Sequence, residues 1–435
     1  MSDTYENIDL NGNLRGLVTL KGFYIQGVDY PEMNQLTVKE IVMGESLLTP
    51  GLQTAITFQN SIYLPPGKNF DKFKNKGIWF TLERNYKDLQ GRDINFTMTV
   101  AGNRHTVYRM DSRHFKPTNV SETEEFTVHA CDQSLLDDAK TLVSKSWRCV
   151  TPIDIVKHAL QCGGVPPDQL DYDETKPNRD YIAENIHPFQ VINQQANVAL
   201  YDDHPDFVHF MTYNWRLGDD TKHHFRSLRS LCKELPGEYA TYYYSDSGLG
   251  QQQPSPDSAV GSYGTVQSVI SMEFPCDFDI LSDILNGIDE NGQEQNTLAT
   301  FNPVQFLFNS SSQTSGCGIG QFNYKIALSN KNTTKQQDSC NMDVEKHVLE
   351  RQARMALLER DKIALRMVVP FNPTLNAGKT VRLLWPNKYE SGTPTYGEGV
   401  YLITSLTHTY KLGGFSTTTI DCVTNTAGVG LTGRA

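Results

Sequence analysis

Histidine is the residue type whose spacing first suggests chemistry in this sequence. The denser group of histidines is His204, His209, His223 and His224. A looser group is His105, His114 and His129. A zinc site needs ligands that converge from fixed spacings, commonly with cysteine or a carboxylate nearby. His209 lies in a strand pattern, and the neighbouring side chains of His223 and His224 diverge on a strand or a helix. We therefore predict half-buried histidines and no metal ion.

Four pairs of adjacent carboxylates are candidates for the acid and base of a glycoside hydrolase. They are Glu124-Glu125, Asp137-Asp138, Asp202-Asp203 and Asp219-Asp220. Adjacent side chains point apart on a strand or a helix, so such doublets are typical of a solvated surface. The sequence also lacks the Gly-x-Ser-x-Gly elbow of serine hydrolases. We predict no catalytic residue.

A glycine-rich segment, residues 316–320 (GCGIG), resembles a phosphate loop in its glycine content alone. The following residues, 321–325 (QFNYK), have a strand pattern, whereas a phosphate loop opens onto a helix whose N-terminus binds the anion. The segment is therefore predicted to be a turn or a bulge. No cofactor is expected.

Composition and charge exclude several classes of protein. The chain has 435 residues, which corresponds to about three folding units at roughly 150 residues each. Lys and Arg number 39 against 50 for Asp and Glu, so the formal net charge of −11 argues against tight nucleic-acid binding. The most apolar candidate stretch, residues 363–371, is too short for a membrane helix and is broken by Arg366 and Pro370. We predict no membrane insertion.

The N-terminus and the cysteines indicate the compartment. Residues 1–6 are acidic and carry no apolar run, so no secretory signal is expected and the protein would be made in a cytoplasm. The eight cysteines contain no Cys-x-x-Cys pair and no repeated spacing. We predict free thiols, because a disulfide framework belongs to small secreted proteins.

The segment 1–130 has the alternating pattern of antiparallel strands. Between Asp93 and Val100, apolar residues alternate with polar ones, which places one face on a core and the other in water. Further strands are predicted at residues 107–110 and 125–129. We expect a meander that closes into a first β-barrel, because closure removes the sheet edges.

The segment 131–205 changes to helical spacing and is predicted to be a helical insert. Its first helix runs from Leu135 through Val143 after a cap at Asp132 or Ser134. A second begins at Thr151-Pro152 and ends at Gly163-Gly164, and a third begins near Pro188.

Strand character returns in the segment 206–245, which is predicted to be part of a second barrel. It contains strands at residues 207–211 and 239–244, with a short helix at 224–235 between them. The segment 246–341 is rich in turn formers, so we predict a loop-rich insertion.

The C-terminal segments repeat the β pattern after one helix. Residues 342–362 are predicted to form a connecting amphipathic helix, 363–425 a second β-barrel, and 426–435 a tail. A hairpin turn at 412–414 joins the last two strands. The fold class is thus α+β, mainly β, with two small antiparallel tube-like β-barrels, a helical insert and a loop-rich insertion.

The C-terminal region also carries a recognisable motif. Residues 373–381 (PTLNAGKTV) and 399–408 (GVYLITSLTH) fit the pattern P-x-L-x-x-G-x-x-V followed by G-x-Y-x-V-x-x-x-x-H, with Ile403 in place of valine. This pattern resembles that of the central baseplate hub proteins of contractile-tailed phages, relatives of the late-control protein and of the type VI secretion spike base.

The resemblance implies a structural hub and no enzyme. It implies a homotrimer whose two barrels per chain form a pseudo-sixfold ring, adapting the sixfold tail tube to the threefold central spike and lining the DNA exit channel. The partners would be a tail spike protein, a tail tube protein, the tape measure and other baseplate proteins. The location would be the virion tail baseplate, and the host cytoplasm during assembly.

Two other functions remain open at this stage. A tail-associated peptidoglycan hydrolase would need a carboxylate pair that converges in a cleft, and turnover of murein would reveal it. A receptor-binding or carbohydrate-binding barrel is suggested by 20 Tyr and 4 Trp. The aromatic share of 10% is ordinary, and binding to host cells would test this function.

Overall fold

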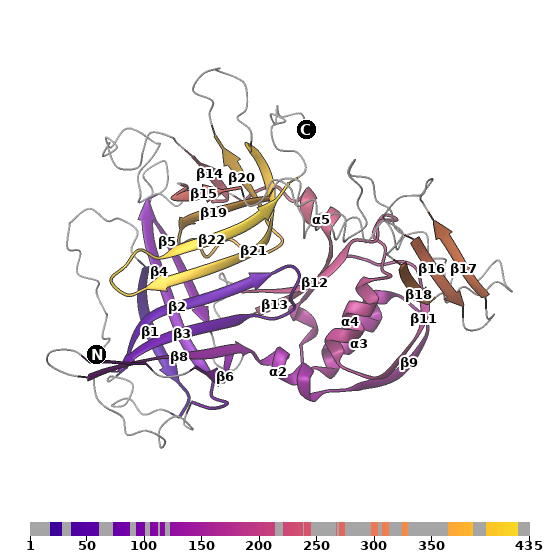
Figure 1. Cartoon of the computed structure of the whole chain (residues 1–435), viewed down its shortest axis with the longest axis horizontal. Helices are drawn as coiled ribbons and strands as arrows, with labels where there is room; N and C mark the ends of the chain where they lie inside the picture. The colour runs from indigo at the N-terminus through magenta and orange to yellow at the C-terminus, as the bar shows by residue number, and fades with distance from the viewer. Residues whose placement is uncertain are drawn as a thin grey trace.

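A computed structural model describes residues 18–27, 36–60, 73–87, 93–100, 105–111, 114–117, 122–213, 221–237, 239–244, 267, 269–274, 297–302, 307–312, 324–328, 364–385 and 397–424. The described chain is mainly β, as the sequence predicts (Figure 1). No described helix is long and apolar enough to cross a membrane.

The largest sheet combines strands from the beginning and the end of the chain. Its eleven strands follow the main path β15-β19-β22-β21-β2-β3-β8-β6, with β7, β14 and β20 attached. The bounds are β2 (Leu36–Ser46), β3 (Gln53–Asn60), β6 (His105–Met110), β7 (His114–Pro117), β8 (Glu122–Asp132), β14 (Thr241–Tyr243), β15 (Ser271–Glu273), β19 (Ala364–Pro370), β20 (Thr380–Leu384), β21 (Gly399–Lys411) and β22 (Thr417–Val423). The predicted strands at 107–110 and 125–129 and the hairpin turn at 412–414 are confirmed.

The pairing of β2 with β21 joins the two regions that the sequence assigns to separate barrels. The strands are antiparallel, from Glu40 opposite Lys411 to Ser46 opposite Ser405. The N–H of Leu412 extends the contact by donating to the carbonyl of Lys39 at 2.8 Å. The two regions therefore share one sheet. The described strands pair as open sheets, so closure into two barrels stays a prediction.

A three-stranded antiparallel sheet packs against the large one in Figure 1. Its order is β1-β4-β5, with bounds β1 (Val18–Ile25), β4 (Ile78–Lys87) and β5 (Asp93–Val100). The predicted alternation of β5 is confirmed, because Phe96, Met98 and Val100 are buried. Most of the inner face joins one core with the large sheet. The buried Arg84 of β4 reaches further and donates to the carbonyl of Phe371, after β19.

The segment 131–205 contains the predicted helices and also strands. The helices are α2 (Gln133–Lys140), α3 (Pro152–Cys162) and α4 (Pro188–Ala196), and α3 and α4 pack together beside the β body (Figure 1). Thr151 caps α3 by accepting from the N–H of Asp154 at 3.4 Å, and Gly164 follows its end at φ +78°.

The extent of the first predicted helix is corrected. Helix α2 ends at Lys140, and Val143 begins a strand instead. Strand β9 (Val143–Val150) pairs antiparallel with β11 (Arg179–Ile186). The insert therefore contains both helices and strands. The sequence does not predict β9, because the residues between Val143 and Trp147 are polar and exposed and do not alternate with apolar ones.

The segment after the insert forms a sheet of order β10-β13-β12. Its elements are η2 (Pro167–Gln169), β10 (Leu170–Tyr172), β12 (Phe207–Tyr213), β13 (Thr221–Ser227) and α5 (Leu228–Lys233). The predicted helix over 224–235 is wrong in its first turn, because β13 extends to Ser227. Alternate residues of β13 are fully and partly buried, which is the burial pattern of a strand.

The segment 246–341 carries strands where the sequence predicts mainly loops. Strand β15 joins the large sheet through β19. Three further strands form a sheet of order β17-β16-β18, namely β16 (Thr297–Asn302), β17 (Leu307–Ser312) and β18 (Tyr324–Leu328). The predicted connecting helix 342–362 and the tail 426–435 lie outside the described residues.

The prediction that every cysteine is a free thiol is wrong. Cys149, at the end of β9, is disulfide-bonded. Among the described cysteines, four are free, namely Cys131, Cys162, Cys232 and Cys422.

Candidate functional site

A buried carboxylate lies where β2, β12 and the loop 372–379 meet. Glu45, near the end of β2, is only 3% exposed. Its Oε1 accepts from the N–H of Tyr213 at 2.8 Å and from Nδ2 of Asn376 at 3.0 Å. Its Oε2 accepts from the N–H of Ala377 at 2.8 Å. We call Glu45, Tyr213, Asn376 and Ala377 the carboxylate junction, because it fastens three segments that are far apart in the sequence.

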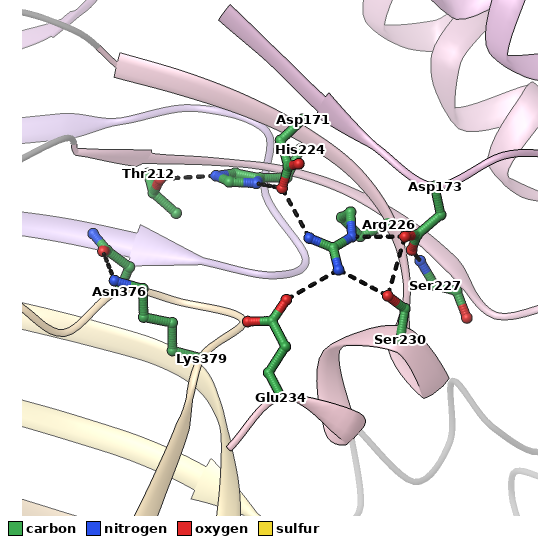
Figure 2. Close-up of polar contacts among 10 residues, drawn as sticks. All are labelled: Asp171, Asp173, Thr212, His224, Arg226, Ser227, Ser230, Glu234, Asn376 and Lys379. Carbon is green, nitrogen blue, oxygen red and sulfur yellow. Dashed lines mark hydrogen bonds and ion pairs between the residues drawn. The ribbon is translucent and has the colours of Figure 1, made fainter. Parts of the chain in front are cut away.

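The electrostatics of the junction are set by burial. Burial raises the pKa of Glu45 to about 7, although the hydrogen bonds from Tyr213, Ala377 and Asn376 and the charge of Lys379 lower it. The Nζ of Lys379 donates to Oδ1 of Asn376 at 2.8 Å (Figure 2). The amide nitrogen of Asn376 therefore faces Glu45. The carboxyl group therefore titrates near neutral pH while it holds the segments together.

Tyr213 connects the junction to a second buried polar set. Its hydroxyl lies 3.0 Å from Oγ1 of Thr54 and 3.2 Å from Nε2 of His105. Burial lowers the pKa of His105 to about 4, so the imidazole is neutral at pH 7. Nearby Asp132 caps α2 and accepts from Oγ1 of Thr221 at 2.8 Å. These contacts fasten β12 and β13 to the N-terminal strands.

A second cluster is centred on Arg226 of β13 (Figure 2). Its guanidinium donates to Asp171 at 2.9 Å, to Ser230 at 2.7 Å and to Glu234 at 3.0 Å, and forms an ion pair with Asp173 at 3.0 Å. Burial disfavours the charge of Arg226, but Asp171 and Asp173 outweigh it and raise the pKa. This Arg226 cluster ties β10 and β13 to α5.

His224 belongs to the same cluster. With the proton on Nδ1, it donates to Asp171 at 3.0 Å and accepts from Thr212 through Nε2 at 2.9 Å. Its ring stacks on Phe210 at a centroid distance of 4.7 Å. Burial lowers the pKa of His224, and the hydrogen bonds from His224 and Arg226 hold the pKa of Asp171 well below its usual range. Every polar atom named here has a partner within the protein, which is the pattern of a structural network.

The Arg226 cluster gives a stability prediction. We expect Arg226→Met to lower the free energy of unfolding by about 2–4 kcal/mol, because it leaves the carboxylates of Asp171 and Asp173 without their cation. Urea unfolding at pH 7 measures the loss. The control is Arg366→Met, whose side chain is 47% exposed while pairing with Glu273 and Asp421.

Exposed ion pairs contribute about 0–1 kcal/mol, so the control should lose no more than that. Equal losses in the two variants would contradict a structural role for the Arg226 cluster.

The structure separates the histidines of the denser group. Nε2 of His209 lies 3.2 Å from Nδ1 of His223, whereas His224 points to the other side of β13, as its alternation requires. His204 contacts Arg229. Within the described part of the chain, no group of three or more His, Cys, Asp and Glu residues could hold a metal ion. In the looser group, His129 pairs with Asp111 at 2.6 Å.

The described residues of the carboxylate doublets make no hydrogen bond to Glu45. Asp138 accepts from the N–H of Phe189 at 2.7 Å, at the start of α4. Asp202 and Asp203 occupy a turn with φ +48° and +64°. Glu125 forms a 3.8 Å ion pair. The pair 219–220 and the glycine-rich segment 316–320 lie outside the described residues.

The C-terminal motif of residues 373–381 and 399–408 lies directly beside the junction. Residues 373–378 form the loop that contains Asn376 and Ala377, and the N–H of Gly378 donates to the carbonyl of Ile403 at 2.9 Å. The predicted packing of the motif strands is confirmed, because their inward residues share one core: Val381, Leu383, Tyr401 and Ile403. His408, the last motif residue, contacts Thr418 at 2.8 Å.

Sequence reasoning did not identify Glu45 or Arg226. The signal for Glu45 is its place in the alternation of β2, where Ile41 and Met43 point inward and Glu45 continues the same face. An acidic residue at an inward position needs buried donors. Arg226 carries no comparable signal.

The fold that contains this junction is similar to that of a solved phage tail protein. The chain is similar to the tail protein from Neisseria meningitidis MC58, with a TM-score of 0.50 and 9% identity, covering 95% of this chain and 98% of that one.

Two further solved structures are also similar. The 43 kDa tail protein of prophage MuSo2 from Shewanella oneidensis has 10% identity and a TM-score of 0.45, covering 89% of this chain and 96% of that one. A type VI secretion system component from Escherichia coli has 11% identity and a TM-score of 0.46, covering 94% and 78%. No family model and no curated protein sequence matches the chain.

Proposed function

We propose that the chain is the structural hub of a contractile phage baseplate. The observation that supports this most directly is the β2–β21 pairing, which places the N-terminal and C-terminal β regions in one sheet. The carboxylate junction fastens β12 to that sheet, and the Arg226 cluster holds β10, β13 and α5 together. A rigid chain with two linked β regions is what a ring adaptor between two symmetries requires.

The proposed assembly is a homotrimeric ring. Three chains with two β regions each would present six similar units to the sixfold tail tube and a threefold face to the central spike. A closed ring is favoured because head-to-tail contacts that complete a rotation leave no growing end. The tail spike protein, the tail tube protein and the tape measure would be its partners, in the virion tail and, during assembly, in the host cytoplasm.

The negative net charge of the chain is consistent with lining a channel through which DNA exits. Three chains carry 3 × −11 = −33 formal charges. An acidic lumen would repel the phosphate backbone and keep the exiting DNA from binding.

We infer that the hub has no enzymatic activity. The buried polar groups of the junction and of the Arg226 cluster hydrogen-bond one another. Groups arranged in this way hold segments together. The hub role is therefore favoured over a peptidoglycan hydrolase.

Light scattering on the purified chain tests the trimer. At several concentrations, alone and with the spike protein added, we expect a particle of three chain masses, each of 49.0 kDa, in at least one condition. The same samples should leave murein intact.

A monomer that persists with and without the spike protein would contradict the ring. Turnover of murein by the purified chain would instead support the hydrolase.

A further inference from the structure

A cysteine and a histidine lie side by side in the last turn of helix α3. Sγ of Cys162 lies 3.5 Å from Nδ1 of His158. The two residues are four positions apart, which places both side chains on one face of the helix. Sulfur and imidazole nitrogen are the ligand atoms that zinc prefers in proteins. We call Cys162 and His158 the thiol–imidazole pair.

The separation of the two atoms is the one that a tetrahedral metal ion requires. Zinc lies about 2.3 Å from a thiolate sulfur and about 2.0 Å from an imidazole nitrogen. At a tetrahedral angle, these bond lengths place the sulfur about 3.5 Å from the nitrogen. The thiol–imidazole pair therefore already has the spacing of two ligands on one ion.

The surrounding residues hold the pair in place and leave it open to solvent. Helix α3 packs a buried stripe, which includes Ile155 and Val156, into the core of the insert. The ring of His158 makes an edge contact with Trp147 of β9, at a centroid distance of 5.5 Å. Cys162 is exposed, so an ion can reach its sulfur from solvent.

The charges near the pair act in both directions. Cys162 is the last residue of α3, and the C-terminal end of a helix carries a partial negative charge that favours a cation. Lys145 of β9 opposes a cation through its positive charge. Burial and this same charge lower the pKa of His158, however, so its imidazole is neutral at pH 7. The neutral imidazole is the form that binds a metal ion.

We propose that the thiol–imidazole pair binds one divalent metal ion of the zinc class through Sγ of Cys162 and Nδ1 of His158. On binding, the thiol releases its proton to solvent and its sulfur donates an electron pair to the ion. Because the described residues contain no group of three or more His, Cys, Asp and Glu that could hold a metal, water would fill the other coordination positions. The site goes beyond the hub function and does not depend on it.

Alkylation of the cysteines in the full wild-type chain tests the site. The chain is freed of metal, N-ethylmaleimide is added with and without Zn²⁺ at pH 7, and labelled peptides are quantified by mass spectrometry. We expect saturating Zn²⁺ to slow the alkylation of Cys162 by at least about tenfold, because the attacking sulfur is then bound to the ion. Cys232, an exposed free thiol on α5, is the internal reference and should keep its rate. Mg²⁺ prefers oxygen ligands and should change neither rate.

The variant His158→Ala shows whether the histidine is a ligand. Loss of one ligand should raise the Zn²⁺ concentration that half-protects Cys162 by about 10–100-fold. Gln161→Ala is the matched control, because Gln161 is exposed in the same turn and supplies no ligand to the proposed ion. It should leave that concentration unchanged.

Equal alkylation rates of Cys162 with and without Zn²⁺ in the wild-type chain would overturn the site, and this measurement needs no variant. Equal slowing of Cys162 and Cys232 would also overturn it, because any exposed thiol would then bind the ion. Half-protection of a folded His158→Ala variant at the wild-type Zn²⁺ concentration would overturn the pair, because the cysteine would then act without the histidine.

Discussion

Gly378→Ala is expected to lower the free energy of unfolding by about 2–5 kcal/mol. Gly378 has φ +84°, a conformation that L-residues adopt only with strain. A Cβ atom there would also lie 2.7 Å from Cζ of Phe210. That ring is buried and stacks on His224, so it cannot move away without disturbing the Arg226 cluster. Urea unfolding monitored by far-UV circular dichroism measures the loss.

Gly164→Ala is the matched control for this substitution. Gly164 has φ +78°, but an added Cβ would meet no atom within 4 Å. Its cost should be limited to the backbone strain, about 1–2 kcal/mol. If the two variants unfold at the same urea concentration, the contact between Phe210 and the motif loop has no energetic role.

The sequence predicts elements well where local patterns agree with burial. Helix α3 begins at Thr151 and Pro152 as expected, because the cap, the proline and the apolar stripe all indicate the same start. The last hairpin is also predictable from the sequence, because a glycine, Gly413 at φ +66°, forms the turn between two strands of alternating pattern. In both places the information lies within about ten residues.

Strands with polar residues at both outward and inward positions are not predicted by hydrophobic alternation. In β13, His223 and Ser227 are buried while His224 and Arg226 are half-buried, so hydrophobicity does not alternate although burial does. Their burial is stabilised by partners on other elements, such as Asp171 on β10. The sequence alone cannot supply that partner.

The candidate site is hidden from sequence for the same reason. Glu45 acquires its role from Tyr213 and Ala377, which follow it by 168 and 332 residues. The motif 373–381 did locate the loop. What it could not show is that the loop presents N–H donors to a carboxylate on β2, because this depends on the β2–β21 pairing.

The protein is expected to lose on the order of 4 kcal/mol of unfolding free energy between pH 7 and pH 5. Burial lowers the pKa of His209 to about 3 and those of His105 and His408 to about 4. Because the folded pKa lies below the unfolded value of 6.5, stability present above pH 6.5 is lost as the unfolded chain takes up protons. Each histidine contributes about 2 kcal/mol over this interval, and Glu45, whose shift has the opposite sign, offsets about 2 kcal/mol. Urea titrations at the two pH values measure the difference.

Two variants separate these opposing contributions. His408→Gln retains a side chain that can hydrogen-bond Thr418 but does not titrate, so the loss of unfolding free energy between pH 7 and pH 5 should shrink by about 2 kcal/mol. Glu45→Gln removes the offset, so the loss should grow by a similar amount. If both variants shift the loss in the same direction, burial does not govern these groups. A wild-type protein that is equally stable at pH 7 and pH 5 would show that the buried histidines take up protons without opening the core.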